Sequence, residues 1–121
     1  MLEPSRELSD DESALLSKLL EGDWNGAREA RDQLLTARRT TFATGDLDFD
    51  LEVDSGLLPI PAPDGILEPT DQLVYRDGVC VAGVMIWISR GRLSSVEYYL
   101  LSELDYDRLP LAVEVRRDAG V

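Results

Sequence analysis

The stretch that decides the fold is VCVAGVMIWIS, residues 79–89. Apolar residues occupy both sets of alternating positions, so a strand made from this stretch requires cover on both of its faces. The pairs Asp77-Gly78 and Arg90-Gly91 flank it, and such pairs are typical of tight hairpin turns. We therefore predict that residues 79–89 form the central strand of an antiparallel meander, between strands at 72–76 and 92–101.

Upstream of the meander, apolar residues recur at helical spacing in two segments. Ser9 and Glu12 make a capping-box pattern, and the helix that they start is predicted to end near Glu21. A second helix is predicted over residues 25–38, with one apolar face toward the core. The residues of that face are Ala27, Ala30, Leu34 and Leu35. The two helices should form a hairpin that packs on the sheet.

After the helices, the spacing of apolar residues changes to two. A short strand is predicted at 39–42, and a half-buried strand is predicted over 47–53, where apolar residues alternate with acidic ones. The proline-rich residues 58–65 suit an extended crossing between two halves of one sheet, because proline cannot donate to a strand ladder. Residues 109–115 are predicted to add a short edge strand.

These elements predict an α+β domain in which an N-terminal helical hairpin packs on a mostly antiparallel β-sheet meander. A chain of 121 residues is the usual size for one domain with one core. We expect a single domain over 1–121, with weakly ordered ends at 1–7 and 116–121.

The chain is strongly acidic, with 24 acidic residues, 12 basic residues and a formal net charge of -12. This charge repels the phosphates of nucleic acids and anionic lipids, so neither nucleic acid nor a membrane is an expected partner. The start of the chain lacks a signal-peptide pattern, and its longest apolar run is too short to span a bilayer. Cys80 is the single cysteine, which suits a reducing compartment, and we predict a cytoplasmic protein.

The sequence contains no recognisable catalytic or cofactor-binding pattern. It has no histidine, which removes the commonest general base and the commonest zinc ligand. Phosphate-binding glycine motifs are also absent from it. Asp46, Asp48 and Asp50 have the spacing of a calcium loop, but Leu51 stands where that loop needs glycine. We therefore expect a non-enzymatic protein with no cofactor and no metal site.

Acidic residues at every second position from Asp46 to Asp54 would project from one face of a strand. Such a face suits a basic partner protein, and an exposed member of the pair Tyr98-Tyr99 would add an aromatic anchor. The candidate partner-binding residues are Asp46, Asp48, Asp50, Glu52, Asp54 and Tyr99. An acidic face that only keeps the protein soluble is the alternative interpretation.

A second hypothesis concerns Glu97, which interrupts a strand-like run between Val96 and Tyr98. In an apolar pocket near a tyrosine, Glu97 with Trp87 would form a site for a small ligand or for a minor enzymatic activity. A third hypothesis is a homodimer that pairs through an exposed strand edge and has a structural role.

Two segments of the sequence carry a resemblance to a known group. Residues 7–27 with Gln33-Leu34, and Gly91 to Tyr99, resemble a group of small actinobacterial proteins of unknown function. In that group a helical hairpin precedes a strand of the form Gly-x-Leu-x-x-hydrophobic-Glu-x-aromatic and a Leu-Pro ending, which Leu109-Pro110 matches. No cysteine stands at residues 43–46, where relatives often have one, so a thiol or metal role does not carry over.

The strand from Gly91 to Glu97 is also similar to strands in some immunity proteins of bacterial toxin systems. Those proteins are often small, acidic, single-domain α+β inhibitors, and the similarity implies an inhibitor of a basic partner. The leading hypothesis is therefore an acidic protein-binding module, with an immunity-type inhibitor as its specific form.

Overall fold

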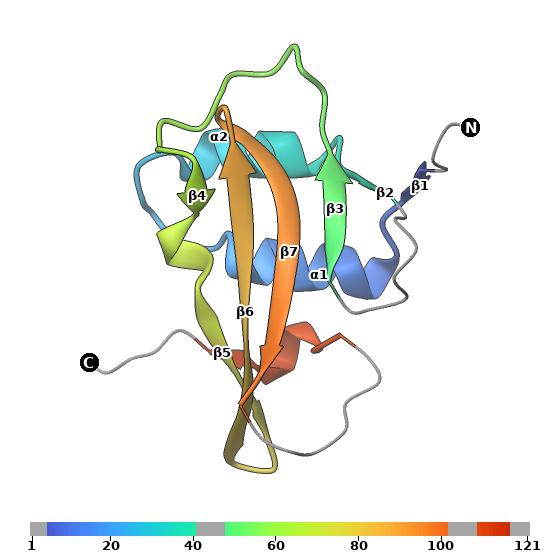
Figure 1. Ribbon diagram of the computed structural model, residues 1–121, viewed down its shortest axis with the longest axis vertical. Coiled ribbons are helices and arrows are strands. Elements are labelled where there is room, and N and C mark those ends of the chain that lie inside the picture. The colour runs from blue at the N-terminus through green and yellow to red at the C-terminus, as the bar shows by residue number, and fades with distance from the viewer. Residues whose placement is uncertain (1–4, 41–47, 102–108, 117–121) are drawn as a thin grey trace.

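The computed structural model describes residues 5–40, 48–101 and 109–116, and over these residues it is an α+β fold (Figure 1). All strand pairs are antiparallel, and the order across the sheet is β1-β2-β3-β7-β6-β5-β8, with β4 paired to β6. The elements are β1 (Ser5–Glu7), α1 (Asp10–Leu19), α2 (Ala27–Leu34), β2 (Arg38–Thr40), β3 (Phe49–Glu52), β4 (Gly65–Ile66), η1 (Glu68–Thr70), β5 (Gln72–Arg76), β6 (Val79–Ser89), β7 (Arg92–Leu100), η2 (Ala112–Glu114) and β8 (Val115–Arg116).

Strand β6 is the middle strand of the meander β5-β6-β7, as the sequence predicts. It pairs along most of its length with β7 on one side and with β5 and β4 on the other. Every residue from Val81 to Ile86 is buried, so both faces of the strand are covered. Figure 1 shows α1 and α2 together behind the sheet, running across the strands, so the two helices cover one face only.

The core lies between the helices and this covered face. Leucines of α1 pack there against alternate residues of β6 and β7. The largest apolar members with full burial are Leu15, Leu16, Leu19, Leu20, Val74, Val81, Val84, Ile86, Leu93 and Val96. Burying such side chains contributes about 1.5–3 kcal/mol each, and this contribution offsets the entropy lost on ordering the chain.

Helix α1 begins with the predicted capping box. The Ser9 side chain accepts from the Glu12 N–H at 3.1 Å, and the Glu12 carboxylate accepts from the Ser9 N–H at 2.8 Å. The helix ends at Leu19, with Leu20 as its C-cap, two residues before the predicted end at Glu21. The hairpin is therefore confirmed, with a shorter first helix than the sequence suggests.

Glu12 also ties α1 to the first two strands. Its buried carboxylate accepts from both terminal nitrogens of Arg6 at 2.8 Å and from Arg39 Nη1 at 2.7 Å. Arg39 in turn lies over the ring of Phe49 in β3, 4.4 Å from its centroid. Burial opposes ionisation of Glu12, but the hydrogen bonds from Arg6, Ser9 and Arg39 and the charge of Arg6 outweigh it and lower its pKa to about 2.

Helix α2 differs from its prediction in length and in its buried face. It starts at Ala27, after Gly26 in the left-handed conformation, and ends at Leu34 rather than near Arg38. Leu35, predicted to be buried, is 86% exposed because the buried residues of α2 recur at Ala27, Ala30 and Gln33, and the C-cap Leu35 does not lie on that side. Gln33, which was not predicted to be buried, is fully buried together with Ala30.

Gln33 is buried because it joins α2 to the turn between β6 and β7. Its Nε2 donates to the carbonyls of Gly91 at 2.8 Å and Leu58 at 3.1 Å, and its Oε1 accepts from the Leu93 N–H at 3.0 Å. All the polar atoms of the amide are thereby paired, which is the condition for burying a polar side chain at low cost. Ile60 adds a further link, because its N–H donates to the Gly91 carbonyl at 2.8 Å.

The two ends of the described chain take part in the sheet. Ser5–Glu7, placed in a weakly ordered start, form β1 and pair with β2. The edge strand predicted at 109–115 is limited to Val115–Arg116, which pair with β5, and the 3-10 turn η2 precedes it. Both ends are held by pairing with strands distant in sequence, which local patterns do not reveal.

The Glu12 contact predicts an acid-sensitive loss of stability. Glu12→Gln should lower the free energy of unfolding near neutral pH by about 2 kcal/mol, because the paired charge is lost from a buried site. The folded-state pKa is about 2 against the ordinary 4.5, so the contribution is complete above about pH 4.5 and is lost as pH falls toward 2. Urea unfolding as a function of pH measures it.

The control for that measurement is Asp10→Asn, which removes an exposed carboxylate from the same first turn of α1. The difference in free energy of unfolding between wild type and Glu12→Gln should become smaller as the pH falls from 4.5 toward 2. A difference that stays constant across this pH range would contradict the assigned role of Glu12.

Gln33→Leu tests the link between α2 and the sheet. The leucine has similar size but leaves the Leu93 N–H and the Leu58 carbonyl without their partner, so we expect a loss of about 3 kcal/mol in the free energy of unfolding. Asp32→Ala, an exposed neighbour on α2, should change stability by less than about 0.5 kcal/mol. Equal unfolding midpoints for the two variants would refute this role.

Candidate functional site

The candidate site lies on the sheet face opposite the helices, which we call the open face. Residues paired across antiparallel strands point to the same side of a sheet. Trp87 pairs with Ser95, Ser95 also lies next to Asp50 of β3, and Met85 pairs with Glu97. The intervening residues Val84, Ile86, Val96 and Tyr98 are buried and face the core.

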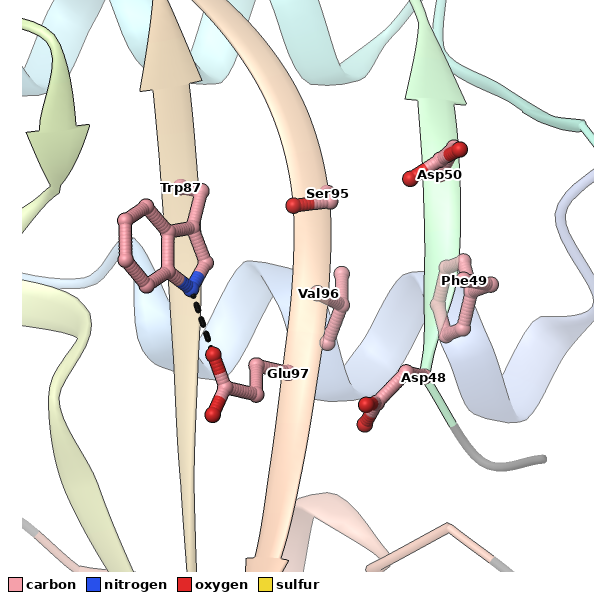
Figure 2. Close-up of a pocket in the computed structure, with 7 residues that line it drawn as sticks. All are labelled: Asp48, Phe49, Asp50, Trp87, Ser95, Val96 and Glu97. Atoms are coloured by element: carbon pink, nitrogen blue, oxygen red, sulfur yellow. Dashed lines mark hydrogen bonds between the residues drawn. The ribbon is translucent and has the colours of Figure 1, made fainter.

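A groove runs over the open face between β3, β7 and β6 (Figure 2). It has a volume of about 310 Å³, enough for one long side chain. The residues that line it are Asp48, Phe49, Asp50, Trp87, Ser95, Val96 and Glu97. Phe49 and Val96 are buried core residues, so the sheet itself forms the floor.

Trp87 and Glu97 are held together at one side of the groove. The indole Nε1 donates to Glu97 Oε1 at 2.8 Å, from β6 to β7 (Figure 2). Both side chains are half-buried. The hydrogen bond fixes the plane of the indole and the position of the carboxylate, so both groups are set before any ligand arrives.

Asp48 is held at the other side of the groove, directly before β3. Its Oδ1 accepts from the backbone N–H of Tyr98 at 2.8 Å. This places the carboxylate where a longer β3 would supply a backbone carbonyl, and it leaves Asp48 exposed. Asp50 follows at the next outward position of β3, exposed and opposite Ser95.

The carboxylates of the groove have no basic partner, which is also true of most acidic side chains among the described residues. Glu12 pairs with Arg6 and Arg39, and Glu114 pairs with Arg76 at 3.0 Å. Within the described residues, no lysine or arginine makes a salt bridge with Asp48, Asp50 or Glu97. The groove is therefore a concentration of uncompensated negative charge beside an aromatic ring.

Only part of the predicted acidic row reaches this groove. Glu52 lies at the end of β3, opposite Arg38 in the ladder. Asp54 has left the strand, and its Oδ1 accepts from the Gly56 N–H at 2.8 Å in a turn, so the prediction that it projects beside the others is wrong. Asp46 lies outside the described residues.

Tyr99 lies on the open face, next to the groove but not in its lining. Its ring covers Gly83 of β6, its partner across the strands. Burial raises the pKa of Tyr99 above its ordinary value, and the charge of Asp71 and the hydrogen bond to it raise it further. The phenol is therefore protonated at neutral pH. Tyr99 adds aromatic surface beside the groove and no negative charge.

The surroundings of Glu97 also differ from the prediction. An apolar pocket with a tyrosine was expected, but Glu97 shares its groove with Asp48 and Asp50, and neither Tyr98 nor Tyr99 lines it. Tyr98 points into the core instead. Ser95 also lines the groove and was not predicted, because its position follows from the strand register and from no local pattern.

In the described part of the chain, the Cys, Asp and Glu side chains form no group of three that would hold a metal ion. Helices α1 and α2 have 10 and 8 residues, and neither has the length and apolar character that crossing a bilayer requires. Comparisons with protein-family models, curated proteins and solved structures found no match.

The contact between Tyr99 and Gly83 is testable by a double-mutant cycle. A Cβ at residue 83 would overlap the Tyr99 ring, so Gly83→Ala should cost about 1–3 kcal/mol of unfolding free energy. In a Tyr99→Ala background the same change should cost much less, because the overlapping ring is gone. Equal costs in the two backgrounds, measured by urea unfolding, would mean that the ring does not rest on residue 83.

Proposed function

We propose that this chain is a non-enzymatic protein-binding module that engages the basic surface of a partner protein through the groove on its open face. The observation that carries the proposal is the group of Asp48, Asp50 and Glu97, which has no basic partner within the described residues and lies beside Trp87. An immunity-type inhibitor of a basic protein is one form of such a module.

Charge and position both support a protein partner. A net charge of -12 accelerates encounter with a basic surface, and the groove concentrates that charge on the face without helices. Trp87 and Tyr99 supply the rigid aromatic surface that often dominates interface energies. The open face thus combines long-range attraction with short-range contact area.

A small-ligand site is the second candidate, because about 310 Å³ lies at the lower end of the volumes of known ligand pockets. Such pockets are mostly apolar, whereas three of the seven residues that line this groove are carboxylates. The lining therefore favours a cationic protein surface over a typical small molecule.

Charge reversal at Asp50 tests the proposal. Asp50→Lys should reduce capture of the partner from a lysate of the source cell by roughly tenfold or more, because it puts a positive charge, like that of the partner, on the lining of the groove. Asp32→Lys on α2 is the matched control, since it makes the same charge change at an exposed position on the helix side. The same stoichiometric, salt-sensitive protein should elute from wild type and from Asp32→Lys.

Two results would count against the proposal. Equal capture by Asp50→Lys and wild type would remove the groove from the interface. Equal loss from Asp50→Lys and Asp32→Lys would reduce the interaction to an effect of net charge, with no particular face involved.

A further inference from the structure

We infer that the groove is built to receive an arginine side chain of the partner, with its guanidinium stacked on the indole of Trp87 and hydrogen-bonded to the surrounding carboxylates. This inference rests on the proposed function and specifies which group of the partner enters the site. It follows from the orientation of Trp87 and from which carboxylate oxygens are already engaged.

The indole offers a stacking surface. Figure 2 shows the ring of Trp87 face-on, with its Nε1 edge turned toward Glu97. Trp87 is half-buried, and its ring lies flat over the strands on the open face, with one side toward the viewer in Figure 2. A guanidinium stacked on that side lies parallel to the ring, so its N–H groups point sideways toward the carboxylates.

The hydrogen bonds already present leave one oxygen of each held carboxylate for a ligand. Glu97 uses Oε1 for the indole, and Asp48 uses Oδ1 for the Tyr98 N–H. Within the described residues, Glu97 Oε2 and Asp48 Oδ2 have no hydrogen-bond donor, and Asp50 lies two residues after Asp48 on the β3 side of the lining, level with Ser95. These acceptors are spread across the groove from β7 to β3, not gathered at one point.

This spread favours arginine over lysine. A guanidinium carries five N–H donors in a fixed plane, so it can stack on a ring and bond to separated carboxylates at once. An ammonium is a compact, strongly hydrated charge with three donors, and it gains less from an aromatic face. A protein is the source to which we commit, because Tyr99 extends the accessible surface beyond the groove.

The test uses blocked single residues as probes and the two tryptophans as reporters. Protein labelled with ¹⁵N is titrated with N-acetyl-argininamide and, separately, with N-acetyl-lysinamide, which carry the same charge. The Trp87 indole N–H signal should shift and saturate with the arginine probe. The same signal should show roughly fivefold weaker binding of the lysine probe. Trp24, whose indole donates to the Glu21 carbonyl near α1, should not respond.

Glu97→Gln is the informative variant because its amide oxygen still accepts from the Trp87 indole while the charge is removed. This variant should bind the arginine probe roughly fivefold more weakly than wild type, since a charge-assisted hydrogen bond becomes a neutral one. Asp32→Asn, with the same charge change on α2, should leave the titration unchanged.

The outcomes separate this inference from the proposed function. Equal responses to the two probes, or no response to either, overturn the arginine site, and the Asp50→Lys capture experiment still decides whether the face binds a basic protein. An arginine response together with capture that Asp50→Lys leaves intact overturns the protein source and identifies the site as one for free guanidinium compounds.

Discussion

The constraint on which the structure depends is that both faces of β6 must be covered although there are only two short helices in the described residues. Its residues from Val81 to Ile86 are buried on both sides, but the two α-helices pack on one side only. On the other side the sheet is covered by its own side chains, with the Tyr99 ring over Gly83 and Trp87 against Glu97. The aromatic surface of the open face therefore arises from the same requirement as the core.

Buried polar residues fix how the helices sit on the sheet, which apolar packing alone does not specify. Glu12 joins α1 to β1 and β2, Gln33 joins α2 to the β6–β7 turn, and Gln72 Nε2 donates to the Leu19 carbonyl at the end of α1. Each contact has directional geometry, whereas apolar contacts tolerate sliding. The layer of helices is thereby held in one position on the sheet. The sheet that forms the floor of the groove is supported from the opposite face.

The sequence predicts the architecture well because the architecture follows from local patterns. The capping box at Ser9, the apolar run of β6 and the turns at Asp77 and Arg90 are all readable, and the α+β meander follows from them. The burial of Gln33 is not readable, because its partners lie 58 and 60 residues away. A polar residue on an apolar helix face is normally placed in solvent until those partners are known.

The candidate site was only partly predictable for a similar reason. A two-residue turn that pairs Ser89 with Arg92 would, with regular pairing, put Ser94 opposite Trp87. The register instead shifts after Ile88, so Ser95 and Glu97 share the face of Trp87. A shift of one residue exchanges the two faces of a strand, and no residue type marks this bulge in the sequence.

The bond between Gln33 and the β6–β7 turn also has a consequence for the order of folding. The two helices are local in sequence, but the groups that lock α2 in place belong to a hairpin 58 to 60 residues later. Closing a loop of that length costs chain entropy before any native contact repays it, which slows folding in proteins rich in distant pairings. During synthesis, α2 therefore emerges well before its docking surface exists, and it reaches its final position only after the β6–β7 turn has formed.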